Sequence, residues 1–139
     1  MAELAGAALA LSLFFDLGVC PVGNEFKSGR RFAEAAMPYL RVADERVMFP
    51  QAFSGVYNLY TGITSMPVAR RWDEARAKLA GDRAVAMITA RRFLKSRRVS
   101  LPPGVEPVVE RRVGHRLMVL LANRALLERV AGARDDRRE

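Results

Sequence analysis

Residues 83–89 read RAVAMIT, and this short apolar stretch decides how the chain is expected to fold. Its apolar residues are consecutive rather than alternating, which is typical of a strand covered on both faces of a sheet. Before it, ARRWDEARAKLAG (69–81) has helical spacing, with Trp72, Ala75 and Leu79 on the inward face and Gly81 as the stop. In this helix we also expect Glu74 to pair with Lys78, four residues on.

Further helices and strands are expected on the N-terminal side of RAVAMIT. Ser28 is expected to cap a helix that presents Phe32, Ala35, Ala36 and Tyr39 on one face and ends near Met37, because a proline follows. RVMFP (46–50) is predicted to be a strand, AFSGVYNLYTG (52–62) a short helix, and ITSMPV (63–68) a brief strand.

On the C-terminal side, ARRFLKSRR (90–98) predicts a short basic helix, and VEPVVERRVGHRLMVLLAN (105–123) predicts a hairpin. Pro107 assigns the first strand of this hairpin to a sheet edge, since proline cannot donate a ladder hydrogen bond. The alternation of elements predicts an α/β fold, with a small four- or five-stranded sheet and helices on its faces.

The expected organisation has three parts: an apolar helix at 1–23, a soluble α/β domain at 24–122 and a frayed, charged helical tail at 123–139. The run AGAALALSLFFDLGVCPV (5–22) is apolar on every face. As a helix its 18 residues would span roughly 27 Å, close to the thickness of a bilayer core. We therefore expect the end of a membrane span; a buried core helix and a signal segment are the alternatives.

Basic residues are concentrated in one part of the 139-residue chain, which carries a net charge of +8. Residues 70–98 contain ten basic and three acidic residues, a net charge of +7. Two clusters are candidate phosphate contacts. The first is Lys27, Arg30 and Arg31, which directly follows the apolar run, and the second is Arg91, Arg92, Lys95, Arg97 and Arg98. A stop-transfer flank and a solvated helix surface, respectively, are the simpler interpretations.

Residues with catalytic or metal-binding potential are sparse. The one histidine, His115, lies beside the expected hairpin turn, without a cysteine or carboxylate at a metal-ligand spacing. No Gly-rich loop joins a strand to a helix in the way that dinucleotide binding requires. We predict no catalytic residue, metal or cofactor in this chain, and whether it has activity of its own is left open.

The order of the segments resembles a known family. FKSGRRFAEAAMPYL, RVMFP, GVYNLYTG, MPV, the Trp-Asp-Glu helix, AVAMIT and HRLMVLLAN follow an apolar helix. This order is similar to the C-terminal end of bacterial membrane glycosyltransferases of the aminoarabinose transferase and protein mannosyltransferase superfamily. The resemblance implies a non-catalytic accessory domain outside the cytoplasmic membrane, attached to a parent enzyme that uses a polyprenyl-phosphate sugar. Its partners would be the membrane and the lipid-linked sugar.

The basic residues after the apolar run disagree with this resemblance. Basic residues in that position favour a cytoplasmic location for the domain that follows them. Large domains are translocated despite such charges. The alternative function is a free-standing basic module that binds nucleic acid or an acidic partner through residues 70–98. The sequence has no recognition-helix or zinc signature to support nucleic-acid binding.

Overall fold

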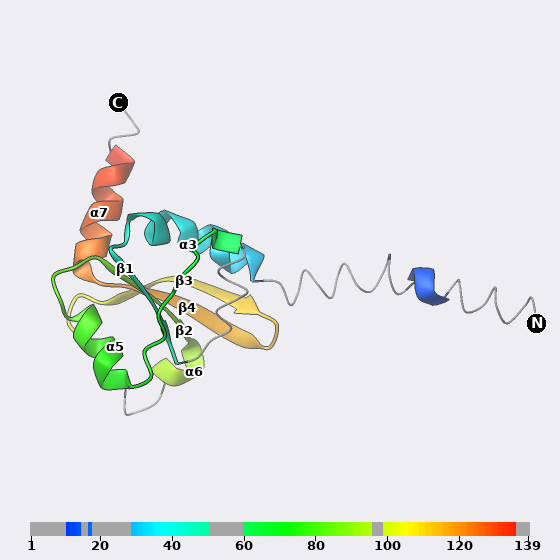
Figure 1. Cartoon of the computed structure of the whole chain (residues 1–139), viewed down its shortest axis with the longest axis horizontal. Helices are drawn as coiled ribbons and strands as arrows, with labels where there is room; N and C mark the ends of the chain where they lie inside the picture. Colours follow the sequence, from blue (N-terminus) through cyan, green and yellow to red (C-terminus); the bar gives the residue numbers. More distant parts are fainter. Residues whose placement is uncertain (1–10, 15–16, 18–28, 51–59, 96–98, 136–139) are drawn as a thin grey trace, which may run out of the picture.

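A computed structural model describes residues 11–14, 17, 29–50, 60–95 and 99–135 of the chain. It confirms the α/β class, with one four-stranded mixed sheet in the order β1-β2-β4-β3 (Figure 1). The elements are α3 (Arg30–Val42), β1 (Glu45–Phe49), α5 (Trp72–Leu79), β2 (Val85–Ala90), α6 (Arg91–Leu94), β3 (Glu106–Val113), β4 (Arg116–Ala122) and α7 (Arg124–Asp135).

Strand β2 is the centre of the sheet, as RAVAMIT predicted. It pairs in parallel with β1 and antiparallel with β4, and all six of its residues are buried. Helices cover both faces of the sheet: α3 and α7 lie on one side, α5 and α6 on the other (Figure 1). Five of its six residues are apolar because neither of its faces meets water, and the sixth, Thr89, is buried as well.

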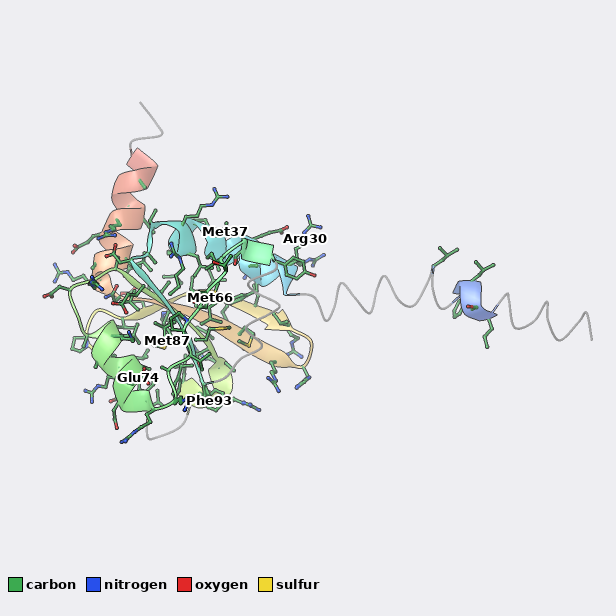
Figure 2. The ribbon with its side chains drawn as sticks, viewed as in Figure 1. Arg30, Met37, Met66, Glu74, Met87 and Phe93 are labelled. Carbon is green, nitrogen blue, oxygen red and sulfur yellow. The ribbon has the colours of Figure 1, made fainter. Side chains whose placement is uncertain are left out.

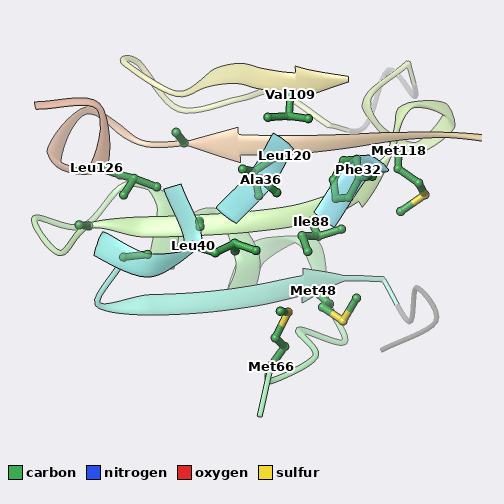
Figure 3. Close-up of a cluster of buried hydrophobic side chains, with 14 of the residues drawn as sticks. Phe32, Ala36, Leu40, Met48, Met66, Ile88, Val109, Met118, Leu120 and Leu126 are labelled. Atoms are coloured by element: carbon green, nitrogen blue, oxygen red, sulfur yellow. The ribbon is translucent and has the colours of Figure 1, made fainter. Parts of the chain in front are cut away.

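The two faces of the sheet carry separate hydrophobic clusters. The α3 and α7 side contains Phe32, Ile88 and Leu120 (Figure 3), whereas the opposite side contains Met87 and Leu121. Consecutive strand residues such as Met87 and Ile88 therefore belong to different clusters, as the pleat of a strand requires.

Helix α3 continues beyond the predicted end near Met37 and contains Pro38 in its interior. The prediction was wrong because the packing of the next turn outweighs the hydrogen bond that proline cannot donate. Pro38 itself is exposed, and Leu40, two residues later, is 1% exposed in the core. The buried residues of this helix are Phe32, Ala33, Ala36 and Leu40, while the expected core residues Ala35 and Tyr39 are partly buried.

The N-cap of α3 is Gly29, and the expected cap Ser28 lies outside the described residues. In α5, Ala75 and Leu79 are buried as predicted, and Trp72 is partly buried with its ring centroid 5.4 Å from that of Phe49.

The expected pair between Glu74 and Lys78 is not the one that the structure contains. Lys78 Nζ instead contacts Glu45 Oε2 at 2.8 Å, and the backbone N–H of Arg70 donates to Glu74. Each side chain has a different partner. Lys78 pairs with Glu45 on the neighbouring strand β1. The carboxylate of Glu74, near the start of the helix, accepts from an otherwise unpaired N–H.

The C-terminal hairpin is present, with β3 at the sheet edge and Pro107 in it, next to a register shift between Pro107 and Val109. Its turn contains Gly114, whose φ of 59° is the left-handed conformation that glycine adopts without strain.

Two other expected elements had different outcomes. The brief strand at 63–68 is reduced to a single bridge between Met48 and Val68. Most of the short helix expected at 52–62 lies outside the described residues. Within this range, residues 60–61 are described and are helical.

The segments at the two ends of the chain differ in how they relate to the core. Helix α7, in the segment expected to be a frayed tail, places Leu126 and Val130 in the core beside α3. Of the expected apolar helix at 1–23, residues 11–14 are described as helical. Within the described ranges, no helix has both the length and the apolar composition needed to cross a membrane.

Candidate anion-binding site

Helix α6 is held against the sheet by its apolar residues, which leaves its basic residues facing outward. The chain turns from extended to helical at Ala90, the last residue of β2. Phe93 packs against both hydrophobic clusters, with its ring centroid 6.1 Å from that of Phe49 (Figure 2). Leu94 is also partly buried on this side. Because one face of a short helix is buried, its other residues must point toward solvent.

The pairing register of β2 and β4 brings a second basic segment next to α6. Ala90 at the end of β2 lies opposite Met118 near the start of β4, so the β3–β4 turn is adjacent to the beginning of α6. A groove of about 240 Å³ lies between them. We call it the α6–turn groove, and its lining residues are Ala90, Arg91, Arg92, Lys95, His115, Arg116 and Leu117.

The basic side chains of the α6–turn groove have distinct contacts. Arg91 is half-buried and lies 3.4 Å from the carboxylate of Glu110 on β3. The guanidinium of Arg92 is 4.8 Å from the centroid of the Phe93 ring, a cation–π contact. Arg116 donates from Nε to His115 Nε2 at 3.3 Å, and Lys95 is exposed.

The sequence identified the α6 part of this groove and missed the other part. Arg91, Arg92 and Lys95 are brought together, whereas Arg97 and Arg98 lie outside the described residues. His115 and Arg116 were interpreted only as part of a hairpin. Their proximity to α6 depends on how β2 pairs with β4, and no local spacing in the sequence carries that information.

The other predicted basic cluster is only partly described. Lys27 lies outside the described residues, and Arg30 and Arg31 are the exposed first two residues of α3. Figure 2 labels Arg30. Arg30 Nε donates to Glu34 Oε1 at 2.7 Å, and this hydrogen bond and the charge of Glu34 raise the pKa of Arg30.

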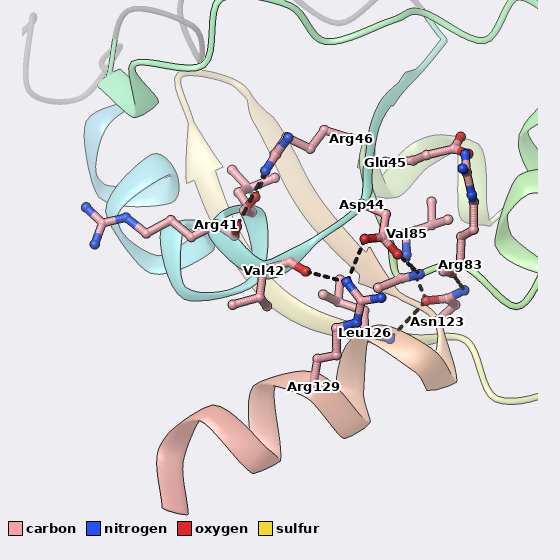
Figure 4. Close-up of polar contacts among 12 residues, drawn as sticks. Arg41, Val42, Asp44, Glu45, Arg46, Arg83, Val85, Asn123, Leu126 and Arg129 are labelled. Atoms are coloured by element: carbon pink, nitrogen blue, oxygen red, sulfur yellow. Dashed lines mark hydrogen bonds and ion pairs between the residues drawn. The ribbon is translucent and has the colours of Figure 1, made fainter. Parts of the chain in front are cut away.

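A second set of polar contacts surrounds the start of β1, and Figure 4 shows those of Asp44 with α7. Arg129 donates to Asp44 at 2.6 Å, and Glu45 lies 2.8 and 3.0 Å from Lys78 and Arg83, respectively. These hydrogen bonds hold the pKa of both carboxyl groups below their ordinary values. Each carboxylate is matched by cations of its own fold, so this set serves packing rather than ligand binding.

The described residues contain no group of three or more His, Cys, Asp or Glu side chains that could hold a metal ion. Comparison with known proteins finds no matching family model, no matching curated protein and no matching solved structure.

Proposed function

We propose that this chain is the accessory, non-catalytic, extracytoplasmic domain of a bacterial membrane glycosyltransferase that uses a polyprenyl-phosphate sugar. One observation carries the membrane part of the proposal: the large apolar side chains described in the N-terminal run are exposed. Leu11, Leu13, Phe14 and Leu17 have 60%, 50%, 64% and 76% of their surface accessible.

Apolar side chains with this exposure gain free energy when they leave water. Full burial of one leucine or phenylalanine side chain is worth roughly 1.5–3 kcal/mol. Neither hydrophobic cluster includes a residue of the described part of this run. The interpretation as a buried core helix is therefore less favoured, and the bilayer core is the medium that fits an 18-residue apolar run.

The basic residues at the start of α3 support attachment to an anionic surface. Arg30 and Arg31 lie at the beginning of the helix that follows the apolar run. Each cation near an anionic lipid surface contributes about 1 kcal/mol, and the attraction weakens as salt shortens the screening length. Lys27, Arg30 and Arg31 are proposed as the contacts, and the pairing of Arg30 with Glu34 reduces the share of Arg30.

The enzymatic context rests on the order of segments from the apolar run to HRLMVLLAN. In the family that this order resembles, a multi-helix membrane body carries the catalytic residues, and the terminal domain lies outside the cytoplasmic membrane. The isolated chain should accordingly neither hydrolyse nor transfer a polyprenyl-phosphate sugar.

Vesicle sedimentation of the full chain tests the membrane attachment. A variant with Leu11→Asp, Leu13→Asp, Phe14→Asp and Leu17→Asp should stay in the supernatant, while the wild type should sediment with vesicles. The matched control is Leu11→Ile, Leu13→Ile, Phe14→Leu and Leu17→Ile, which keeps the run apolar and should sediment like the wild type. Equal sedimentation of the Asp variant would refute attachment through this run.

Protease protection tests the location of the domain. In right-side-out bacterial membrane vesicles, added protease should cleave the α/β domain, and in inverted vesicles the domain should be protected. The reverse pattern would place the domain in the cytoplasm and remove the glycosyltransferase interpretation, because the accessory domain belongs on the side where the sugar is transferred.

A second function, a basic module for nucleic acid or an acidic partner, is supported by one observation. Residues 70–98 carry most of the net charge, and the structure brings part of them to the α6–turn groove. Binding of an oligonucleotide whose log affinity falls steeply with log salt, and which is lost when Arg91, Arg92, Arg97 and Arg98 are changed to Gln, would favour this function.

A further inference from the structure

The α6–turn groove gathers positive charge from two elements that are far apart in the sequence. Arg91, Arg92 and Lys95 come from α6, and Arg116 comes from the start of β4. Arg91 pairs with the carboxylate of Glu110 at 3.4 Å, and none of the described residues that line the groove is acidic. The groove therefore has an excess of positive charge.

Strand register places a further cation on the same face of the hairpin as Leu117. Arg112 on β3 lies directly opposite Leu117 on β4, and opposed residues in an antiparallel pair project from the same face of the sheet. Leu117 lines the groove, so Arg112 is on the groove side of the hairpin. A cation in this position strengthens the positive potential of the groove. Arg112 was not part of either basic cluster predicted from the sequence.

Two of these side chains have hydrogen-bond donors available for a ligand. Arg92 rests on the Phe93 ring, and a contact with an aromatic face holds a guanidinium without using a conventional acceptor. Lys95 is exposed at the end of α6. A planar guanidinium fork beside an ammonium group matches the oxygens of a phosphate, which accepts several charge-assisted hydrogen bonds.

The size and floor of the groove restrict what it can hold. At about 240 Å³, it is smaller than the roughly 300–1,000 Å³ of sites for drug-sized ligands. Ala90 and Leu117 form an apolar part of its lining, which suits a carbon-bearing group attached to the phosphate. A phosphate or diphosphate group fits a groove of this size.

Single-stranded nucleic acid is a poorer match for the same surface. Such ligands stack their bases on exposed aromatic rings. Phe93 is the aromatic residue of α6, and it is committed to the two hydrophobic clusters and to its contact with Phe49. The groove offers phosphate contacts without a stacking platform.

We propose that the α6–turn groove binds a phosphate or diphosphate group, with Arg92 and Lys95 as its principal donors. This goes beyond the membrane attachment proposed above and does not depend on it, because none of the groove residues belongs to the apolar run or to the start of α3.

The test is titration of sodium pyrophosphate into the full chain in a non-ionic detergent, followed by backbone amide shifts and calorimetry. Shifts should concentrate at residues 90–95 and 115–117, with affinity that falls as salt is added. The variant Arg92→Gln/Lys95→Gln should bind about tenfold more weakly, because it removes two charged donors while retaining side-chain length and amide hydrogen bonding.

The control variant Arg41→Gln/Arg76→Gln removes the same charge from exposed positions on α3 and α5, and it should bind pyrophosphate within about twofold of the wild type. Circular dichroism should show that both variants are folded. Equal weakening in the two variants would mean a general charge effect and would overturn the proposal, as would shifts spread evenly over the surface.

Two further ligands distinguish the source of the phosphate. Vesicles containing phosphatidic acid supply it as a lipid headgroup, and glycerol 3-phosphate supplies it in solution. Both ligands are tested in the background of the Asp variant of the apolar run, so that vesicle binding does not report attachment through that run. Loss of either interaction when Arg92→Gln/Lys95→Gln is added supports the proposed groove and identifies the source. Binding of both ligands that is equal with and without the Arg92→Gln/Lys95→Gln changes would overturn the proposal.

The groove and the membrane attachment can fail separately. The Asp variant of the apolar run should still bind pyrophosphate normally, since its changes lie outside the groove. Failure of pyrophosphate to bind while vesicle sedimentation persists would reject the groove alone.

Discussion

At the scale of single residues, Asn123 is the polar side chain on which the most backbone depends. It is 2% exposed, and its carbonyl oxygen accepts from the N–H groups of Val85 and Leu126 at 3.0 and 3.2 Å. Its amide nitrogen donates to the carbonyls of Gly81 and Arg83 (Figure 4). One side chain therefore caps α7 and fixes the turn that leads into β2.

Replacing Asn123 with Ala should lower the free energy of unfolding by about 3 kcal/mol, because buried backbone groups lose their partners and each costs roughly 1–3 kcal/mol. Urea denaturation measures the loss. Asn123→Asp keeps the acceptor for the N–H groups of Val85 and Leu126 and sets a carboxylate oxygen against the carbonyls of Gly81 and Arg83, so it tests the two donated bonds. A change below about 1 kcal/mol in the Ala variant would contradict this role.

The lowered pKa values of Asp44 and Glu45 predict how the stability of the fold changes in acid. Hydrogen bonds from Arg129 and from the Ala84 N–H lower the pKa of Asp44, and those from Lys78 and Arg83 lower the pKa of Glu45. A carboxyl group whose pKa is lowered by folding stabilises the native state at pH above its ordinary pKa. That contribution is lost as pH falls through the lowered value.

The melting temperature should therefore fall on acidification below about pH 4.5, the ordinary pKa of Glu45, and continue to fall below the ordinary 3.8 of Asp44. Thermal melts across pH 2–7 measure this. Asp44→Asn/Glu45→Gln should show a smaller decrease from its own value at neutral pH. Asp82→Asn, at an exposed position after α5, is the control and should keep the decrease of the wild type.

At the scale of elements, α3 shows how packing overrides a local signal. Pro38 predicted a helix end, and the helix nevertheless continues to Val42. Ala36 and Leu40 are buried on either side of it in sequence. Burial of Leu40 in the last turn therefore stabilises the helix more than the missing hydrogen bond of Pro38 destabilises it.

Pro38→Ala should raise the free energy of unfolding by about 1–3 kcal/mol, because proline in a helix interior is about 3 kcal/mol less favourable than alanine and part of this is offset by the stiffer unfolded chain. Chemical denaturation measures the gain. Glu34→Ala in the preceding turn, at an exposed position, should leave stability within about 0.5 kcal/mol and serves as control. A destabilised Pro38→Ala variant would mean that the proline shapes the helix in a way that packing requires.

At the scale of the whole molecule, the apolar run and the α/β core are expected to be separable. The described residues of the run are exposed and absent from both clusters, whereas α7 at the other end contributes Leu126 and Val130. Removing residues 1–22 should therefore leave the sheet content and the cooperative thermal transition unchanged, as measured by circular dichroism.

Removing residues 124–139 is the contrasting deletion, and it should abolish that transition or lower its midpoint substantially, because it takes away two core side chains and the ion pair of Arg129 with Asp44. Loss of cooperativity in the first deletion would mean that the apolar run belongs to the core.

The sequence by itself determined the parts of this protein that depend on neighbouring residues. RAVAMIT predicted the central strand β2, and helical spacing predicted α3, α5 and α6, because apolar periodicity reflects which local positions face the core. Pro107 and the glycine at 114 predicted the edge strand and the hairpin for the same local reasons. The basic residues of α6 were also visible.

Only the tertiary structure decided which of these parts meet. The pairing of Ala90 with Met118 places the hairpin turn beside α6 and makes a groove from residues twenty or more positions apart. Lys78 contacts Glu45 across 33 residues rather than its predicted helical neighbour, and Leu126 enters the core from a segment that looked like a tail. Such contacts depend on strand order and register, which arise from the packing of the whole chain and leave no trace in local spacing.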